Sequence, residues 1–161
     1  MGPSLEIAVA LDAGETGWVR FALQVGPNAF EYEISDLTDA LGDLLRATLH
    51  IVCGGEVAQW AFELEPGECK VRLERVVEPL AILDGLRITI TEKRYPSAGE
   101  GCVRELFVAR CTPDRFGAAV LAQANAILHQ VGFEAFRTRW GRPFPLRAFE
   151  ALRLALSTPS A

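Results

Sequence analysis

The sequence has 161 residues and a formal charge of −5, with 50% hydrophobic and 23% charged residues. This length and composition suit one globular domain that buries about 70% of its unfolded surface, which excludes a wholly disordered chain. The acidic balance opposes a general nucleic-acid binder, which needs a basic surface, and no run approaches the roughly 18 apolar residues of a membrane span.

Three segments near the N-terminus alternate apolar and polar residues with the period of a β-strand. The three segments are 5–12, 18–25 and 30–34, and the turns between them are 14–17 and 26–28. Glu6 and Asp12 interrupt the first segment and no basic region precedes it, so it is typical of a strand and not of a signal peptide. The short turns favour antiparallel pairing, because parallel strands would need long crossovers.

The period changes to that of a helix after Ser35. Apolar residues recur at helical spacing from Leu37 to Val52. Ser35 or Asp36 can cap the first N–H groups, and the glycine pair 54–55 can end the helix.

Strand-like alternation then resumes in four segments. These are 58–65, 69–74, 86–91 and 102–111, with a turn at 66–68 and a loop at 95–101. The apolar stretch Val76–Leu83 is irregular and is not placed. Segment 102–111 carries polar residues on both faces, which predicts a bulge, partial cover of both faces, or a carboxylate turned inward.

The C-terminal third is expected to be helical. Thr112, Pro113 and Asp114 have the pattern of a helix start, and the helix is expected to stop near Gly132, with a short piece continuing through Trp140. A last helix should bury Leu146, Phe149 and Leu152, and residues 157–161 should fray. The sequence thus predicts one α+β domain over residues 1–161. We expect a two-layer sandwich, in which a mainly antiparallel sheet of six to seven strands has two to three helices on one face.

The residues that most often carry catalysis show no catalytic arrangement. The four cysteines lack CxxC spacing and are interpreted as reduced, small core residues. His50 and His129 lie near the ends of predicted helices, where a structural role is favoured. We therefore expect no catalytic set, no metal site and no cofactor.

The carboxylate pairs Glu31/Glu33 and Glu63/Glu65 each share a strand face that we expect to be solvated. A general acid or base needs a desolvated carboxylate, and Glu105 is the better candidate because its neighbours Val103 and Phe107 are apolar. One hypothesis is therefore a pocket between helices and sheet with Glu105 as its polar group.

The outward sheet face is the leading candidate for an interaction surface, because an exposed tryptophan among charges is a plausible hot spot. Its candidate binding residues are Trp18, Arg20, Glu31, Glu33, Glu63 and Arg72.

The C-terminal segment also differs from the rest of the chain. From Gly132 onward, five arginines and two glutamates give +3 and leave −8 for the rest of the chain, and aromatic residues interleave with the arginines. The favoured explanation is that the aromatic residues anchor the C-terminal helices on the sheet. A second alternative is contact with another protein, for which Arg137 and Trp140 are the candidate residues. Nucleic-acid binding is the third alternative.

Runs 34–46 and 62–68, together with Trp140 and residues 143–146, resemble a group of small uncharacterised bacterial α+β proteins. The resemblance spans residues 30–155 and carries no active-site signature. Small acidic proteins of this kind are often immunity partners of secreted toxins. The resemblance implies a cytoplasmic, non-enzymatic domain that binds another protein. The role that it implies is that of an immunity protein, which neutralises a bacterial toxin. The alternatives are a structural or regulatory module that dimerises through a sheet edge, and a ligand-binding protein or enzyme that uses the pocket beside Glu105.

Overall fold

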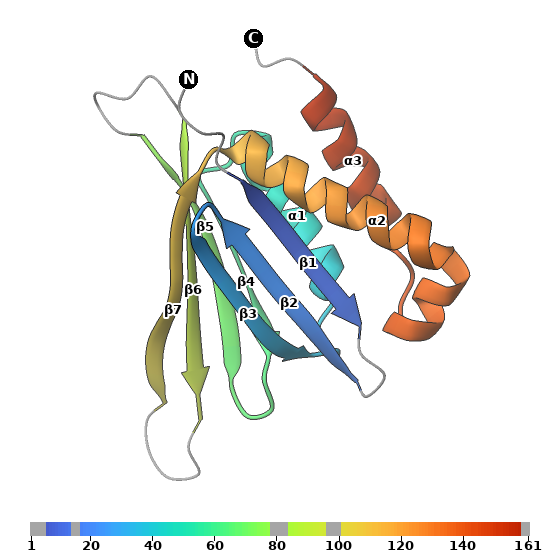
Figure 1. Ribbon diagram of the computed structural model, residues 1–161, viewed down its shortest axis with the longest axis horizontal. Coiled ribbons are helices and arrows are strands. Elements are labelled where there is room, and N and C mark those ends of the chain that lie inside the picture. The colour runs from blue at the N-terminus through green and yellow to red at the C-terminus, as the bar shows by residue number, and fades with distance from the viewer. Residues whose placement is uncertain (1–5, 14–16, 78–83, 96–100, 159–161) are drawn as a thin grey trace.

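The computed structural model describes residues 6–13, 17–77, 84–95 and 101–158, and in these ranges it has seven strands and three helices (Figure 1). The elements are β1 (Ile7–Ala13), β2 (Trp18–Val25), β3 (Asn28–Ser35), α1 (Ala40–Val52), β4 (Val57–Glu63), β5 (Glu68–Val76), β6 (Gly85–Arg94), β7 (Cys102–Cys111), α2 (Pro113–Trp140) and α3 (Leu146–Ser157). The predicted α+β class and the order of strands and helices are confirmed.

The strands form two sheets and not the single sheet that we predicted. Sheet A has the order β1-β2-β3 and sheet B the order β4-β5-β6-β7, and every pairing is antiparallel. Each sheet is built from consecutive strands with short connections, and α1 intervenes between β3 and β4. The single-sheet prediction was wrong because alternation fixes the two faces of a strand but not its neighbour. The two-layer arrangement, which required one sheet, is not confirmed.

The apolar faces of the two sheets contribute to one core. The predicted inward residues of β2 are all buried, and Phe21 lies with its ring centroid 5.2 Å from that of Phe62 in β4. Phe30 in β3 and Phe107 in β7 form a second aromatic contact between the sheets, at 5.9 Å. Helix α1 packs against β4 and β5, and α2 packs against β1, so the helices complete this core.

Helix α1 begins later than predicted, and its cap is Asp39 and not Ser35 or Asp36. The Asp39 carboxylate accepts a hydrogen bond from the Gly42 amide at 3.2 Å, as an N-cap residue should. The Ser35 hydroxyl instead accepts from the Leu37 amide and stabilises the turn before the helix. Leu37 is 59% exposed and outside the helix, contrary to prediction. The helix ends as predicted, before Gly54 at φ 101°.

Strand β7 contains a bulge, which is one of the three alternatives predicted for it, and the bulge explains why polar residues occur on both of its faces. Ile90 pairs with Phe107 while the next residue, Thr91, pairs with Glu105, so Leu106 is the extra residue. The bulge shifts the alternation by one residue. Arg104 therefore lies on the same face as the buried Glu92 before the bulge, although its side chain is exposed, and Phe107 and Ala109 are on that face after the bulge.

The C-terminal helices follow the predicted signals closely. The Thr112 hydroxyl accepts from the Arg115 amide, Pro113 is the first helical residue, and Gly132 at φ 77° interrupts α2 before it continues to Trp140. Phe149 and Leu152 of α3 are buried, but Leu146 is 43% exposed, contrary to prediction. Most of the Val76–Leu83 stretch, of the turn at 14–17, of the loop at 95–101 and of the C-terminal tail lies outside the described residues.

No helix in the described part of the chain is both long and apolar enough to cross a bilayer.

Candidate functional site

The outward face of sheet A carries four of the predicted binding residues. Trp18 and Arg20 project from β2, and Glu31 and Glu33 project from the neighbouring β3. Arg20 donates to Glu31 at 3.3 Å and lies 3.8 Å from Asp12. All three of these charged side chains are well hydrated, so their ion pairs contribute little to stability.

Glu33 has no ion-pair partner among the described residues. Although it lies directly across from Arg20 in the strand register, the Arg20 guanidinium is directed to Glu31 and Asp12. The outward face therefore presents at least one carboxylate whose hydrogen-bond acceptors are available to another molecule.

Small side chains make the middle of this face concave. Alanines from all three strands form the floor of an open hollow of about 340 Å³, with Arg20, Gln24 and Glu31 at its rim. The floor alanines are Ala8, Ala10, Ala22 and Ala29.

A second open hollow, of about 390 Å³, lies beside the first and is called here the Trp18 hollow. Its lining residues are Trp18, Glu31, Tyr32, Glu33, Leu64 and Arg94. Leu64 follows β4 and Arg94 ends β6, so this hollow joins the outer face of sheet A to sheet B. The Trp18 side chain is 36% exposed, whereas Trp60 and Trp140 are buried.

A buried carboxylate fixes the wall of the Trp18 hollow. Glu92 of β6 is only 4% exposed and accepts hydrogen bonds from the Tyr32 hydroxyl, from Arg94 Nε at 2.7 Å and from Arg104 Nη2 at 2.9 Å. Arg94 also donates to the Tyr32 hydroxyl at 3.1 Å. These four residues, the Glu92 group, come from β3, β6 and β7 and link the two sheets.

The electrostatics of the Glu92 group favour a positioning role over acid–base catalysis. The hydrogen bonds from Tyr32, Arg94 and Arg104 and the charge of Arg94 outweigh burial, and they hold the pKa of Glu92 below its usual value. Burial, followed by the bond to Glu92, raises the pKa of Tyr32. A carboxylate that stays ionised at neutral pH and is surrounded by donors is a poor proton shuttle. It is well suited to hold the Arg94 guanidinium in place.

Glu92 was not among the residues singled out from the sequence, although a signal for it exists. The inward residues Leu86, Ile88 and Ile90 alternate along β6, and the same period continues to Glu92. A charged residue at the next inward position indicates a buried, paired carboxylate. Its partner Tyr32 is 60 residues away and could not be identified from local spacing.

Glu105, the predicted inward carboxylate, is exposed and pairs with Thr91 on the outward side of β7. It lines neither of the two hollows beside sheet A nor the two hollows beside the C-terminal helices. The hypothesis of a helix–sheet pocket built on Glu105 is therefore wrong. Its apolar neighbours Val103 and Phe107 were misleading because the bulge at Leu106 separates them onto opposite faces.

Glu63 and Arg72 lie on sheet B, so the single outward plane that we predicted is divided between two sheets. Glu63 is exposed at the end of β4, where its backbone amide donates to the Thr38 hydroxyl at 3.4 Å. Arg72 donates to Gln59 at 3.5 Å and lies 3.6 Å from Glu74. Neither residue lines the Trp18 hollow.

Three of the C-terminal aromatic residues, Phe136, Trp140 and Phe144, are buried, in agreement with the structural interpretation of this segment, whereas Phe133 is 52% exposed. Trp140 stacks on Phe136 at 5.1 Å, and Phe144 packs edge-on against Phe136 at 5.3 Å. All three rings are at most 7% exposed and do not offer a face on which bases could stack. Arg137 is exposed on α2.

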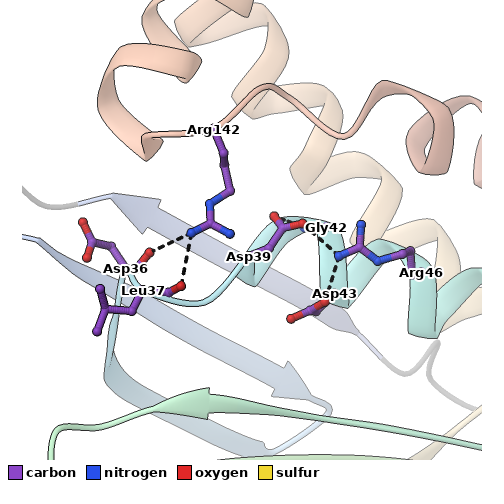
Figure 2. Close-up of polar contacts among 7 residues, drawn as sticks. All are labelled: Asp36, Leu37, Asp39, Gly42, Asp43, Arg46 and Arg142. Carbon is purple, nitrogen blue, oxygen red and sulfur yellow. Dashed lines mark hydrogen bonds and ion pairs between the residues drawn. The ribbon is translucent and has the colours of Figure 1, made fainter.

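Arg142 shows what one of the C-terminal arginines does. Figure 2 shows its guanidinium reaching the connection between β3 and α1, where Nη2 donates to the backbone carbonyls of Asp36 and Leu37 at 3.4 and 3.2 Å. On the first turns of α1, Arg46 bridges the carboxylates of Asp39 and Asp43, both at 2.8 Å. Arg142 therefore holds the segment that follows Glu33 and Ser35 against the C-terminal region.

The cysteines divide into two kinds. Burial raises the pKa of Cys69 and that of Cys111 to about 12, so these two thiols are protonated and unreactive. Cys53 and Cys102 are exposed, so the prediction that all four belong to the core was wrong for these two. Among the described residues no group of three or more His, Cys, Asp and Glu side chains could hold a metal ion.

No protein-family model, no curated protein and no solved structure matches this chain.

Proposed function

We propose that this protein is a non-enzymatic protein-binding domain that contacts its partner with the outer face of sheet A, centred on the Trp18 hollow. The observation that carries the proposal is the juxtaposition of a partly exposed tryptophan with a carboxylate, Glu33, that has no ion-pair partner in the described part of the chain. Tryptophan is enriched at the centres of interfaces, where its large ring is buried on association.

The partner that fits this surface is a basic one. The charged residues of the Trp18 hollow are Glu31, Glu33 and Arg94, and Arg94 is already bound to Glu92. A lysine or arginine of the partner can therefore pair with Glu33 while its aliphatic stem, or its cation, lies on the Trp18 ring. The overall charge of −5 would also accelerate encounter with a basic protein.

The biological role that this chemistry supports is that of a cytoplasmic immunity protein, which blocks a bacterial toxin by covering a basic surface on it. The acidic charge and the open hollow support this role. A blocking protein needs no catalytic groups of its own, only a rigid and complementary surface. The Glu92 group and Arg142 supply that rigidity at two sides of the hollow.

The test compares three variants in capture and binding experiments. Immobilised wild-type protein is used to isolate a partner from its source, and the affinity of that partner is then measured for Trp18→Ala, Glu33→Lys and the control Glu134→Lys. Glu134 is exposed on α2, so its variant makes the same charge change elsewhere on the molecule. We expect each of the first two variants to weaken binding at least about tenfold and the control to have no effect.

For the immunity role, the captured partner should be toxic when expressed alone, and the wild-type protein should protect cells while the Trp18→Ala and Glu33→Lys variants should not. A partner that binds all three variants with the affinity of wild type would place the interface elsewhere and overturn the proposal. Circular dichroism of each variant checks that loss of binding does not reflect loss of the fold.

A further inference from the structure

Strand β7 is the outer edge of sheet B and carries exposed apolar side chains. It pairs with β6 on one side and with no strand of the described residues on the other, and in Figure 1 it forms the left margin of the sheets along most of its length. Val103 is 61% exposed and Val108 is 42% exposed, and both are on the outward face. An edge of ten residues with exposed valines is a template for pairing with another strand.

The devices that usually protect an edge strand are only partly present in β7. Its sequence contains neither proline nor lysine, and it is longer than an ordinary strand. The bulge at Leu106 bends the strand but leaves five regular residues after it. Strand β3 approaches both edge strands of sheet B, but the opposite edge is different because α1 packs on β4.

The outward residues of β7 have a charge pattern that complements itself. Because of the bulge, the outward residues that flank Val108 are Glu105 on one side and Arg110 on the other. A two-fold axis through Val108 would pair β7 with its own copy in antiparallel orientation. Glu105 of each copy would then lie opposite Arg110 of the other, and the two Val108 side chains would meet on the axis.

We infer that the protein forms a homodimer in which two β7 strands pair antiparallel about Val108 and join the two copies of sheet B into one continuous sheet. The occupant of the edge is a second copy because the strand supplies both members of each charge pair. Arg110 also interacts within its own chain, and a guanidinium has enough N–H donors for both contacts. The dimer leaves the Trp18 hollow available, since none of the residues that line it belongs to β7.

The expected affinity is moderate. Pairing of one strand with its copy buries less area than a standard interface of about 1,600 Å², so we expect a dissociation constant in the micromolar range. Sedimentation velocity over a range of concentrations should therefore show a shift from monomer to dimer. A wild-type protein that stays monomeric up to about 1 mM would overturn the inference.

Matched substitutions at the two edges of sheet B test which edge is used. Val108→Asp places two carboxylates on the two-fold axis and should weaken dimerisation at least about tenfold. Val57→Asp is the control, because Val57 lies on the other edge strand, β4, and is similarly exposed at 37%. Loss of the dimer in Val57→Asp with retention in Val108→Asp would assign the interface to β4 and refute the proposed pairing.

The charge pairs are tested by reversal. Glu105→Arg alone should weaken the dimer, and the double variant Glu105→Arg/Arg110→Glu should restore it because each pair is reformed with opposite polarity. Failure of the double variant to recover any affinity would contradict the proposed register. Because Arg110 has a second contact, the melting temperature of each variant is measured beside its affinity.

Cross-linking provides an independent measurement of the register. In a Cys53→Ser/Cys102→Ser background, Val108→Cys should form an intermolecular disulfide on mild oxidation, because opposite residues in paired strands have Cβ atoms close enough to bridge. Val103→Cys is the control, since it is more exposed but its copy would lie about 30 Å away along the strand. Equal cross-linking of both variants would indicate random collision and would count against the dimer.

Discussion

Two groups of arginine and glutamate residues in this protein have the same chemistry but different surroundings. On the outer face of sheet A, Arg20 lies between Asp12 and Glu31, and their side chains are 42%, 64% and 65% exposed. Where the two sheets meet, Glu92 is 4% exposed and is held by Tyr32, Arg94 and Arg104. The first group can exchange its partners with water or with another protein, whereas the second cannot do so without disturbing the fold.

The difference between the two groups indicates which residues stabilise the fold and which are available for binding. A hydrated ion pair contributes little because solvent screens it and because ordering two long side chains costs entropy. A buried carboxylate must keep its donors, since an unsatisfied buried charge is costly. The outer face of sheet A is thus free to change for recognition, while the Glu92 group and the aromatic core hold that face in place.

The largest effect is expected from breaking the aromatic contact between the sheets. Phe62 is fully buried against Phe21 and Trp60, so Phe62→Ala should lower the free energy of unfolding by about 4 kcal/mol. Trp18→Ala, an aromatic truncation on the outer face, should cost less than about 1 kcal/mol. Urea unfolding of both variants measures the two losses, and equal losses would show that the outer face of sheet A stabilises the fold as much as the aromatic core does.

Removal of the buried carboxylate should have the second largest effect. Glu92→Ala leaves the Tyr32 hydroxyl without its acceptor and two arginines without their shared partner, so we expect a loss of about 2 kcal/mol. Arg94 and Arg104 are exposed enough to be hydrated by water, which keeps the loss below that of a fully buried pair. Glu31→Ala on the outer face is the matched control, with an expected change within about 0.5 kcal/mol. A control variant as unstable as Glu92→Ala would show that exposure does not separate the two groups.

The pH dependence of stability should reveal the same carboxylate. The pKa of Glu92 is lowered in the folded protein, so its ionised form contributes stability that is fully present above the usual carboxyl pKa of about 4.3. That contribution is lost as the pH falls through the lowered pKa. The stability difference between wild type and Glu92→Gln should therefore be largest near neutral pH and shrink as the solution is acidified below about pH 4. A difference that does not change with pH would mean that Glu92 acts through packing alone.

The sequence predicts the local elements better than their assembly. Alternation places Val19, Phe21 and Leu23 correctly in the core, and the cap residue Thr112 with Pro113 marks the start of α2. The number of sheets is not encoded in this way, because the alternation of β3 and β4 is the same whether or not they pair. Whether the strands form one sheet or two depends on how α1 and the aromatic residues of both sheets pack together.

The candidate site was predicted in part, and the missing part is non-local. Trp18, Arg20, Glu31 and Glu33 lie on adjacent strands, so a simple antiparallel register brings them to one face. The Glu92 group depends on contacts between β3 and strands of the other sheet, which no local spacing reveals. The prediction for Glu105 was wrong for a local reason, because the single bulged residue Leu106 changes the face on which Glu105 lies.

The smallest effect on stability is expected from Arg20→Ala, which directly tests whether the ion pairs of the outer face stabilise the fold. Loss of two hydrated ion pairs should change the free energy of unfolding by less than about 0.5 kcal/mol, and added salt should reduce even that difference because it screens exposed charges. The same variant releases Glu31 and makes the outer face more negative. If a basic partner binds there, Arg20→Ala should bind it as tightly as wild type or more tightly, while stability is almost unchanged. A variant that loses both stability and binding would show that Arg20 belongs with the Glu92 group, as a residue that maintains the fold.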